Sequence, residues 1–198
     1  EPLVILSGAL KSLAVALMKI ANDLRLLGSG PRAGFAEVKL PANEPGSSIM
    51  PGKVNPTQCE ALSMLACQVM GNDSTISFAA SQGHLQLNVF KPVIVYNLLE
   101  SIRLLADGCR NFNKHCVAGL EPDAQRMADL LERGLMLVTA LNPYIGYENS
   151  TRIAKTALES GRGVLELVRE EKLLDEATLA DILLPENMIA PRLIPLRA

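Results

Sequence analysis

The longest apolar stretch of the chain, residues 3–27, has the pattern of a helix that other segments must cover. Apolar side chains recur on nearly every side of this helix, which is typical of a helix inside a bundle rather than on a surface. The stretch begins without a convincing capping residue and ends at Gly28-Ser29-Gly30-Pro31. An uncapped, buried helix at the start of a chain indicates the later part of a larger protein.

Further long helices are expected, and no segment has the pattern of a β-strand. Apolar residues at three- and four-residue steps predict helices over 57–81 and 92–113. Pro122 indicates another over 121–141, because proline is favoured in a first helical turn. Aromatic residues make up only 4% of the chain, which favours Leu/Ala/Met-rich helix packing over a β-sandwich. The sequence therefore predicts an all-α fold in which residues 1–141 form a long-helix bundle.

Residues 142–198 are expected to form a second, smaller domain of short helices. The periodic segments here lie near 149–159, 163–171 and 176–183. Asp175 precedes the last of them and is predicted to be its N-cap. The tail 191–198 shows no periodicity, and we expect it to be poorly ordered.

The composition argues against several classes of function. The formal net charge is −2 and no Lys- or Arg-rich run occurs, so no nucleic-acid partner is expected. Lys11 and Lys19 interrupt the first apolar run and no basic segment precedes it, so it matches neither a signal peptide nor a membrane span.

The cysteines are expected to be reduced thiols that pack as small apolar groups. Their spacing differs from the C-x2-C pattern of zinc ribbons, so no metal site is predicted. Free thiols suggest a reducing compartment, the cytoplasm or, in a eukaryote, the mitochondrial matrix. The cysteines are Cys59, Cys67, Cys109 and Cys116.

A polar segment, residues 28–56, separates the first two helices. It is long for a connection without secondary structure, and such segments are usually functional or disordered. Interleaved apolar residues argue against disorder. One interpretation is a plain helix start, with Asn55 as N-cap and Pro56 at the first helical position. Ser47 and Ser48 would then satisfy local backbone groups.

The same segment also fits an anion-binding loop. Lys53 and Asn55 are two residues apart, so in an extended segment their side chains leave the same face. An ammonium and an amide donor beside a helix N-terminus would clamp a carboxylate. Ser47 could then act as a base, because backbone donors of the glycine-rich turn and Lys53 would stabilise its negative oxygen. The spacing permits this chemistry and leaves the capping interpretation open.

The residues of this segment resemble a known family. The stretch GSSIMPGKVNP, residues 46–56, closely resembles the signature loop of the fumarase/aspartase superfamily. Its continuation, TQCEALSMLACQVMGND, resembles class II fumarases, in which glycine follows the loop proline and Thr-Gln-Cys-Glu opens the helix. The resemblance extends through LNVFKPV, LLADG and LMLVTALNPYIGY, and more weakly to the end of the chain. It implies that the chain is the C-terminal part of the family's all-α fold.

The resemblance implies roles for particular residues. Ser47 matches the loop serine that removes the carbon-bound proton, and Glu60 matches a glutamate that orients a histidine, the second acid/base group. That histidine lies in the earlier half of the family's chain and reaches the site from another subunit. His84 and His115 are not expected to replace it, and structural roles are favoured for both. The substrate-contacting run is matched by Ser48, Lys53, Val54 and Asn55.

The activity implied for the intact protein is that of fumarate hydratase, a lyase of the tricarboxylic acid cycle that reversibly hydrates fumarate to (S)-malate. The resemblance implies anti addition and elimination with a serine base and an aci-carboxylate intermediate, no metal or organic cofactor, and a homotetramer with shared sites. Without the histidine, this chain alone is expected to be inactive. The alternatives are an aspartase-like ammonia-lyase, against which Gly52 and the run 57–59 speak, and a helical oligomerisation module.

Overall fold

The computed structural model describes residues 1–189 of the 198-residue chain. The chain divides into two compact units, Glu1–Asp123 and Ala124–Ala198. Almost all regular structure in the described part is helical, so the predicted all-α fold is confirmed. The predicted disorder of the tail 191–198 concerns residues outside the described part.

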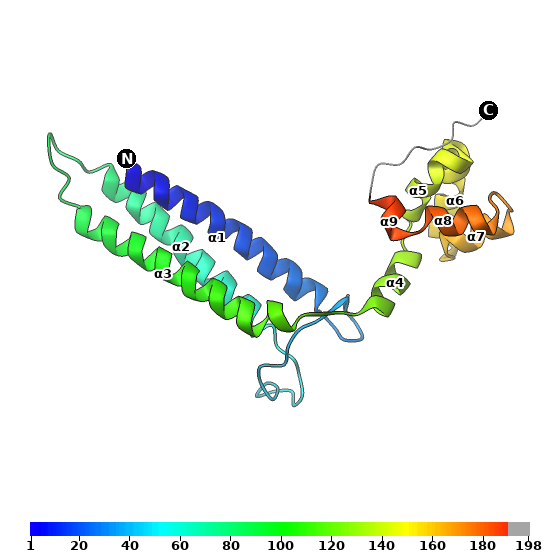
Figure 1. Ribbon diagram of the computed structural model, residues 1–198, viewed down its shortest axis with the longest axis horizontal. Helices are drawn as coiled ribbons and strands as arrows, with labels where there is room; N and C mark the ends of the chain where they lie inside the picture. Colours follow the sequence, from blue (N-terminus) through cyan, green and yellow to red (C-terminus); the bar gives the residue numbers. More distant parts are fainter. Residues whose placement is uncertain (190–198) are drawn as a thin grey trace. The chain divides into compact units, whose positions relative to one another are not determined.

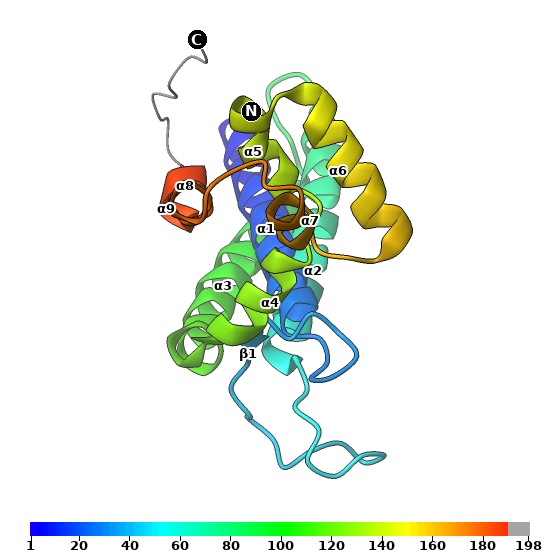
Figure 2. The same ribbon diagram turned by 90° about the vertical axis from the view of Figure 1, so that its right-hand side faces the viewer.

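The first unit is built from long helices that lie side by side (Figures 1 and 2). They are α1 (Pro2–Leu27), α2 (Thr57–Ala80) and α3 (Lys91–His115). The helices predicted from apolar periodicity are therefore confirmed, with bounds that differ by one or two residues. α2 packs extensively against both α1 and α3. The buried apolar residues of α2 share one stripe of the helix, at steps of three, four and seven residues: Cys59, Leu62, Ala66, Val69, Ile76 and Ala79.

The expectation that the first helix is buried on nearly every side is wrong for this chain. In α1 the buried residues are Ser7, Ala14 and Ala21, spaced by seven, while Ile5 and Val15 are 73% and 53% exposed. Small residues in the buried stripe allow α1 to approach α2 closely, but the unit supplies no helix to cover the opposite side within the described residues. By length and composition alone α1 is also apolar enough to cross a membrane, although its stripe is packed against α2.

A buried polar layer joins the helices of the first unit. The Asp73 carboxylate on α2 accepts hydrogen bonds from Ser7 Oγ at 2.7 Å and Lys11 Nζ at 2.5 Å on α1. Burial acts to raise the pKa of Asp73, but the two donors outweigh it, and the pKa is lowered. The neighbouring Asn72 donates to Ser101 Oγ on α3 at 3.1 Å. Adjacent residues of α2 thus fix its register against both neighbours, because a shift would leave them buried without partners.

The expectation of no β-strand is wrong in one detail. β1 (Val38–Lys39) pairs antiparallel with β2 (Glu121–Pro122), with Val38 opposite Pro122. Strands of two residues are too short to leave a period-two pattern in a sequence. Between α3 and β2 lies a short 3-10 turn, η1 (Val117–Gly119). The strand pair ties the segment after α1 to the segment after α3.

The buried residues of the second unit form one apolar core within the described part of the chain, to which its first helix contributes none. The helices are α4 (Ala124–Glu132), α5 (Leu137–Ile145), α6 (Tyr147–Ser160), α7 (Val164–Glu170), α8 (Glu176–Ile182) and α9 (Pro185–Met188). The short helices predicted after residue 142 correspond to α6, α7 and α8. Asp175 caps α8 as predicted, because its Oδ1 accepts a hydrogen bond from Thr178 N at 2.9 Å.

The continuous helix predicted over 121–141 is wrong. α4 ends at Glu132, and the chain turns through Gly134, whose N–H donates to the Leu131 carbonyl at 2.9 Å, before α5 begins. A Cβ at Gly134 would lie 3.0 Å from that carbonyl oxygen, so glycine suits the turn. Leu137 and Leu141 of α5 are buried in the core of the second unit. For this reason the division falls between residues 123 and 124, earlier than the predicted 141/142 boundary.

Candidate active site

Residues 40–56, which include the GSSIMPGKVNP stretch, form a hairpin-like loop between β1 and α2. This signature loop extends beyond the helices of the first unit (Figure 1). Its tip is a tight turn in which Ser47 N donates to the Met50 carbonyl at 3.0 Å and Met50 N donates to Ser47 Oγ at 2.9 Å. Gly46 has φ 134°, and a Cβ there would lie 2.7 Å from Gly52 N. Only glycine permits the two limbs to approach so closely. The tip is therefore ordered by contacts within the loop itself.

The predicted N-cap role of Asn55 is wrong. α2 begins at Thr57, Pro56 flanks it, and no side-chain hydrogen bond caps this start within the described residues. The Asn55 amide instead donates to the Gly46 carbonyl at 3.1 Å and to Glu44 Oε2 at 3.3 Å. Asn55 thus fastens the returning limb of the loop, residues 52–56, to the outgoing limb, residues 40–46. The first N–H groups of α2 keep the partial positive charge that favours an anion.

The loop places the other predicted site residues in different environments. Ser47 and Glu60 are half-buried, whereas Ser48, Lys53 and Val54 are exposed. Within the described residues Lys53 forms no ion pair, so its ammonium is available to an anion. Ser47 Oγ is engaged in the turn at the tip, as the simple backbone-satisfying interpretation expects. In this chain the predicted residues share one loop and one helix start but do not close a pocket around a substrate.

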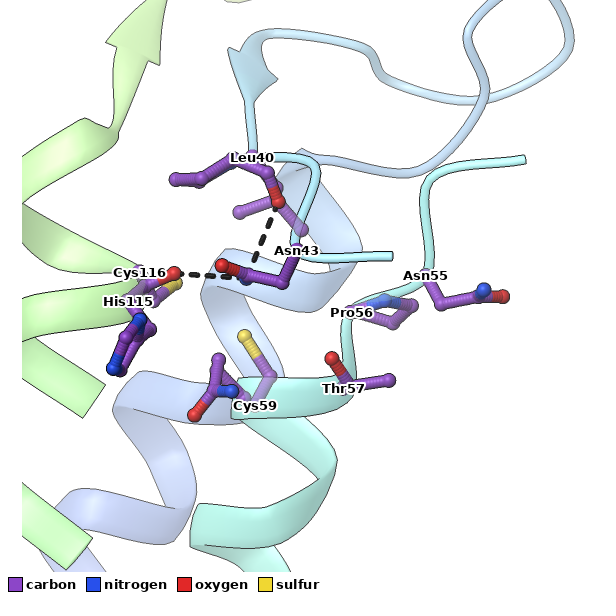
Figure 3. A pocket seen from close by; sticks show the side chains of 10 residues that line it. Leu40, Asn43, Asn55, Pro56, Thr57, Cys59, His115 and Cys116 are labelled. Carbon is purple, nitrogen blue, oxygen red and sulfur yellow. Dashed lines mark hydrogen bonds between the residues drawn. The ribbon is translucent and has the colours of Figure 1, made fainter. Parts of the chain in front are cut away.

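A small cleft lies at the base of the loop (Figure 3). Its accessible volume is about 10 Å³, which is room for about one water molecule. Of the predicted site residues only Asn55 lines it, beside Asn43, Thr57 and His115. Thr57 Oγ1 is buried there without a hydrogen-bond partner in the described part of the chain. The cleft is the point where the loop meets both α2 and the end of α3.

Two buried thiols form part of this base. Cys59 and Cys116 are 0% and 3% exposed and hydrogen-bond each other. Burial, together with the neighbouring Cys116, raises the pKa of Cys59 to about 12. Both thiols stay protonated at neutral pH, and all four cysteines are unbridged. The expectation that the thiols pack as small apolar groups is confirmed for Cys59 and Cys116, but it is wrong for Cys67, which is exposed. Periodicity places Cys59 on the buried face of α2, but the contact with Cys116 could not be read from the sequence.

The two histidines lie near opposite ends of α3. His84 lies exposed in the turn between α2 and α3, and His115 is the last residue of α3. Among the described residues, no group of three or more His, Cys, Asp or Glu side chains gathers as metal ligands would. Asn43, whose amide donates to the His115 carbonyl, was not singled out by the sequence (Figure 3).

Comparison with known proteins agrees with this loop and helix arrangement. The profile of the family described as "Lyase" matches residues 1–71, and that described as "Fumarase C C-terminus" matches residues 137–190. The chain is 84% identical over 189 residues to a class II fumarate hydratase of Pseudomonas aeruginosa, which covers 96% of this chain and 41% of that protein. The chain belongs to the class II fumarase branch of the fumarase/aspartase superfamily.

Other members of the superfamily are also similar to this chain. An aspartate ammonia-lyase of Pseudomonas aeruginosa is 65% identical over 195 residues, covering 98% of this chain and 41% of that protein. The crystal structure of a class II fumarase from Schistosoma mansoni superposes with a TM-score of 0.86 at 48% identity, covering 94% of this chain and 39% of that one. The chain thus spans about two fifths of the length of the superfamily relatives it matches.

Proposed function

We propose that the full-length protein carrying this chain is a fumarate hydratase that interconverts fumarate and (S)-malate. The supporting observation is the 84% identity to a class II fumarate hydratase, in a region that includes the signature loop and the start of α2. The run Gly52 and Thr57-Gln58-Cys59, which resembles fumarases rather than aspartases, supports hydration over ammonia elimination.

In this proposal the Ser47 alkoxide removes a proton from the carbon beside one malate carboxylate. The electron pair moves into that carboxylate and gives a dianionic aci-carboxylate, and the hydroxyl group then leaves as water after receiving a proton. Lys53, Asn55 and the N-terminal N–H groups of α2 would stabilise the growing negative charge. The water-forming proton would come from an acid/base group that Glu60 orients. Such a group would have to come from outside this chain.

The proposed arrangement also favours an oligomer whose subunits complete each other's sites. The loop is open on the side away from the helices, and α1 carries exposed apolar residues such as Ile5 and Val15. A homotetramer with shared sites would cover both surfaces. The chain alone would then lack activity, and a fumarate assay on the 198-residue chain tests this, since turnover at the full-length rate would contradict it.

The full-length Ser47→Ala protein tests the assignment of Ser47 as the base. Its turnover is measured through the absorbance of fumarate. We expect turnover to fall by at least about 100-fold, the lower range for losing a general base, while (S)-malate still binds. Ser160→Ala is a matched control, because Ser160 Oγ donates to the Thr156 carbonyl at 2.6 Å, as Ser47 Oγ does to the Met50 carbonyl at 3.4 Å, but lies in the second unit. Full activity of Ser47→Ala would remove Ser47 from the base role.

The ammonia-lyase alternative is favoured by the 65% identity to an aspartate ammonia-lyase. The same purified full-length protein should be assayed with aspartate under equal conditions. We expect fumarate to form from malate and not from aspartate. If aspartate is the better substrate by kcat/KM, the hydratase proposal is replaced by the ammonia-lyase.

A further inference from the structure

The contact that ties the signature loop to the end of α3 comes from Asn43. Its Nδ2 donates to the His115 carbonyl at 2.9 Å, across 72 residues of sequence, and lies 3.4 Å from the Pro41 carbonyl (Figure 3). His115 is the last residue of α3, where carbonyl groups have no partner within the helix. The Asn43 amide therefore satisfies a helix terminus and holds the outgoing limb of the loop at the same time.

The neighbouring backbone makes this docking point tight. A Cβ at Gly119, in the η1 turn after α3, would lie 2.8 Å from Pro41 Cγ. Pro41 therefore packs directly on the turn that follows α3, two residues before Asn43. The outgoing limb is fixed at this point by the close approach of the Pro41 ring to Gly119 and by the Asn43 hydrogen bond.

The order of the loop tip does not depend on this docking point, but its position does. The tip is closed by bonds between Ser47 and Met50 and between Gly52 and Pro45, all within the loop. Asn55 joins the returning limb to Glu44, the residue after Asn43. Asn43, which is bonded to His115, is therefore linked to the tip, because its neighbour Glu44 is hydrogen-bonded to Asn55.

We propose that Asn43 is a positioning residue that sets where Ser47 and Asn55 stand relative to the helices. This inference rests on the proposed function. Loss of the amide would leave the tip turn formed but let it move relative to the start of α2. A misplacement of about 1 Å at a reacting group can lower turnover by about 100-fold. A carboxylate at this position would be worse than no side chain, because it would face a carbonyl at the negative end of α3.

The test uses full-length Asn43→Asp, Asn43→Ala and Asn43→Gln proteins. We expect kcat to fall by about 10- to 100-fold in Asn43→Ala and further in Asn43→Asp, with a smaller change in KM. Asn43→Gln keeps the donor and should recover part of kcat. Asn187→Ala is the matched control, because Asn187 Nδ2 donates to the Asp181 carbonyl at 2.6 Å in the second unit, and we expect its kcat to be unchanged.

Hydrogen–deuterium exchange of the same proteins gives a readout that a loss of global stability would not imitate. We expect faster exchange in Asn43→Asp over residues 40–44, where the outgoing limb docks on the end of α3. Exchange should be unchanged at the bonded amides of the tip, Ser47, Met50, Gly52 and Lys53, and within α2 and α3. A wild-type kcat in Asn43→Asp, or a kcat that falls only as the thermal midpoint falls, overturns the inference. An inactive wild-type protein with altered loop exchange in Asn43→Asp overturns the proposed function but leaves the anchoring role of Asn43 standing.

Discussion

The two units of the chain bury their apolar residues in different ways. In the second unit, the described residues form one core cluster that spans α5, α6, α7 and α8. In the first unit the buried residues fall into separate small clusters along the helices, several of them built on alanine. The first unit also exposes many large apolar side chains, among them Ile5, Val15, Leu26, Phe78 and Leu99. The difference indicates that the second unit closes its own core, whereas the first presents apolar faces for further helices.

The largest effect that this comparison predicts is on association of the separate units. Residues 1–123 and 124–198, purified separately, should differ in sedimentation velocity. We expect the first to self-associate, because its exposed apolar surface is large, and the second to remain monomeric. A monomeric, folded first unit would contradict the comparison. Circular dichroism of both pieces gives the control for folding.

The next largest effect is expected in the core of the second unit. Leu141 is 0% exposed, so Leu141→Ala should lower the free energy of unfolding by about 2–5 kcal/mol. Leu158, on α6, is 71% exposed, and Leu158→Ala is the matched control with an expected change of about 0.5 kcal/mol or less. Urea denaturation of the 198-residue chain measures both. Similar losses in the two variants would show that the second unit does not close its core as described.

A smaller effect is expected from the polar layer of the first unit. Asp73→Asn should cost roughly 1–3 kcal/mol at neutral pH, because Lys11 loses its charged partner and the buried amide fits the site poorly. The pKa of Asp73 is lowered in the folded state, so its contribution is present above the unfolded pKa and is lost as pH falls through the folded value.

The pH dependence distinguishes this layer from simple packing. We expect the unfolding free energy of the wild-type chain to fall below about pH 4, the unperturbed value for Asp, and that of Asp73→Asn to fall less steeply. Ser7→Ala removes one donor and keeps the charge, so its acid dependence should resemble that of the wild type. If the unfolding free energy fell equally in acid for wild type and Asp73→Asn, Asp73 would contribute nothing to acid sensitivity.

The sequence predicted the long helices because their apolar periodicity persists over many turns. It failed where one residue decides the outcome. Gly134 looked compatible with a helix over 121–141, yet the chain turns there. Asn55 had the residue type of an N-cap, but its amide instead joins the two limbs of the loop, a contact that depends on the tertiary approach of Gly46.

The candidate site shows the same limit. The loop and its residue types could be predicted, because the motif is continuous in the sequence. The role of Asn43 could not be predicted, because its partner is a backbone carbonyl 72 residues away, and such a contact does not depend on the pattern of side chains. The exposure of α1 was likewise missed, since apolar periodicity records which residues avoid water but not which molecule covers them.

The smallest effect is expected at the start of α8, where the second unit depends on a local cap. Asp175 accepts hydrogen bonds from the Thr178 hydroxyl at 2.7 Å and from Thr178 N at 2.9 Å, and these lower the pKa of Asp175. Asp175→Ala should lower the thermal midpoint slightly, and Asp175→Asn, which keeps an acceptor, should lower it less. Because the pKa is lowered, the difference between wild type and Asp175→Ala should be largest at neutral pH. It should shrink toward that between Asp175→Asn and Asp175→Ala as the carboxyl becomes protonated in acid, because a neutral carboxyl still accepts a hydrogen bond. A difference that does not change with pH would show that the charge of Asp175 contributes nothing to the cap.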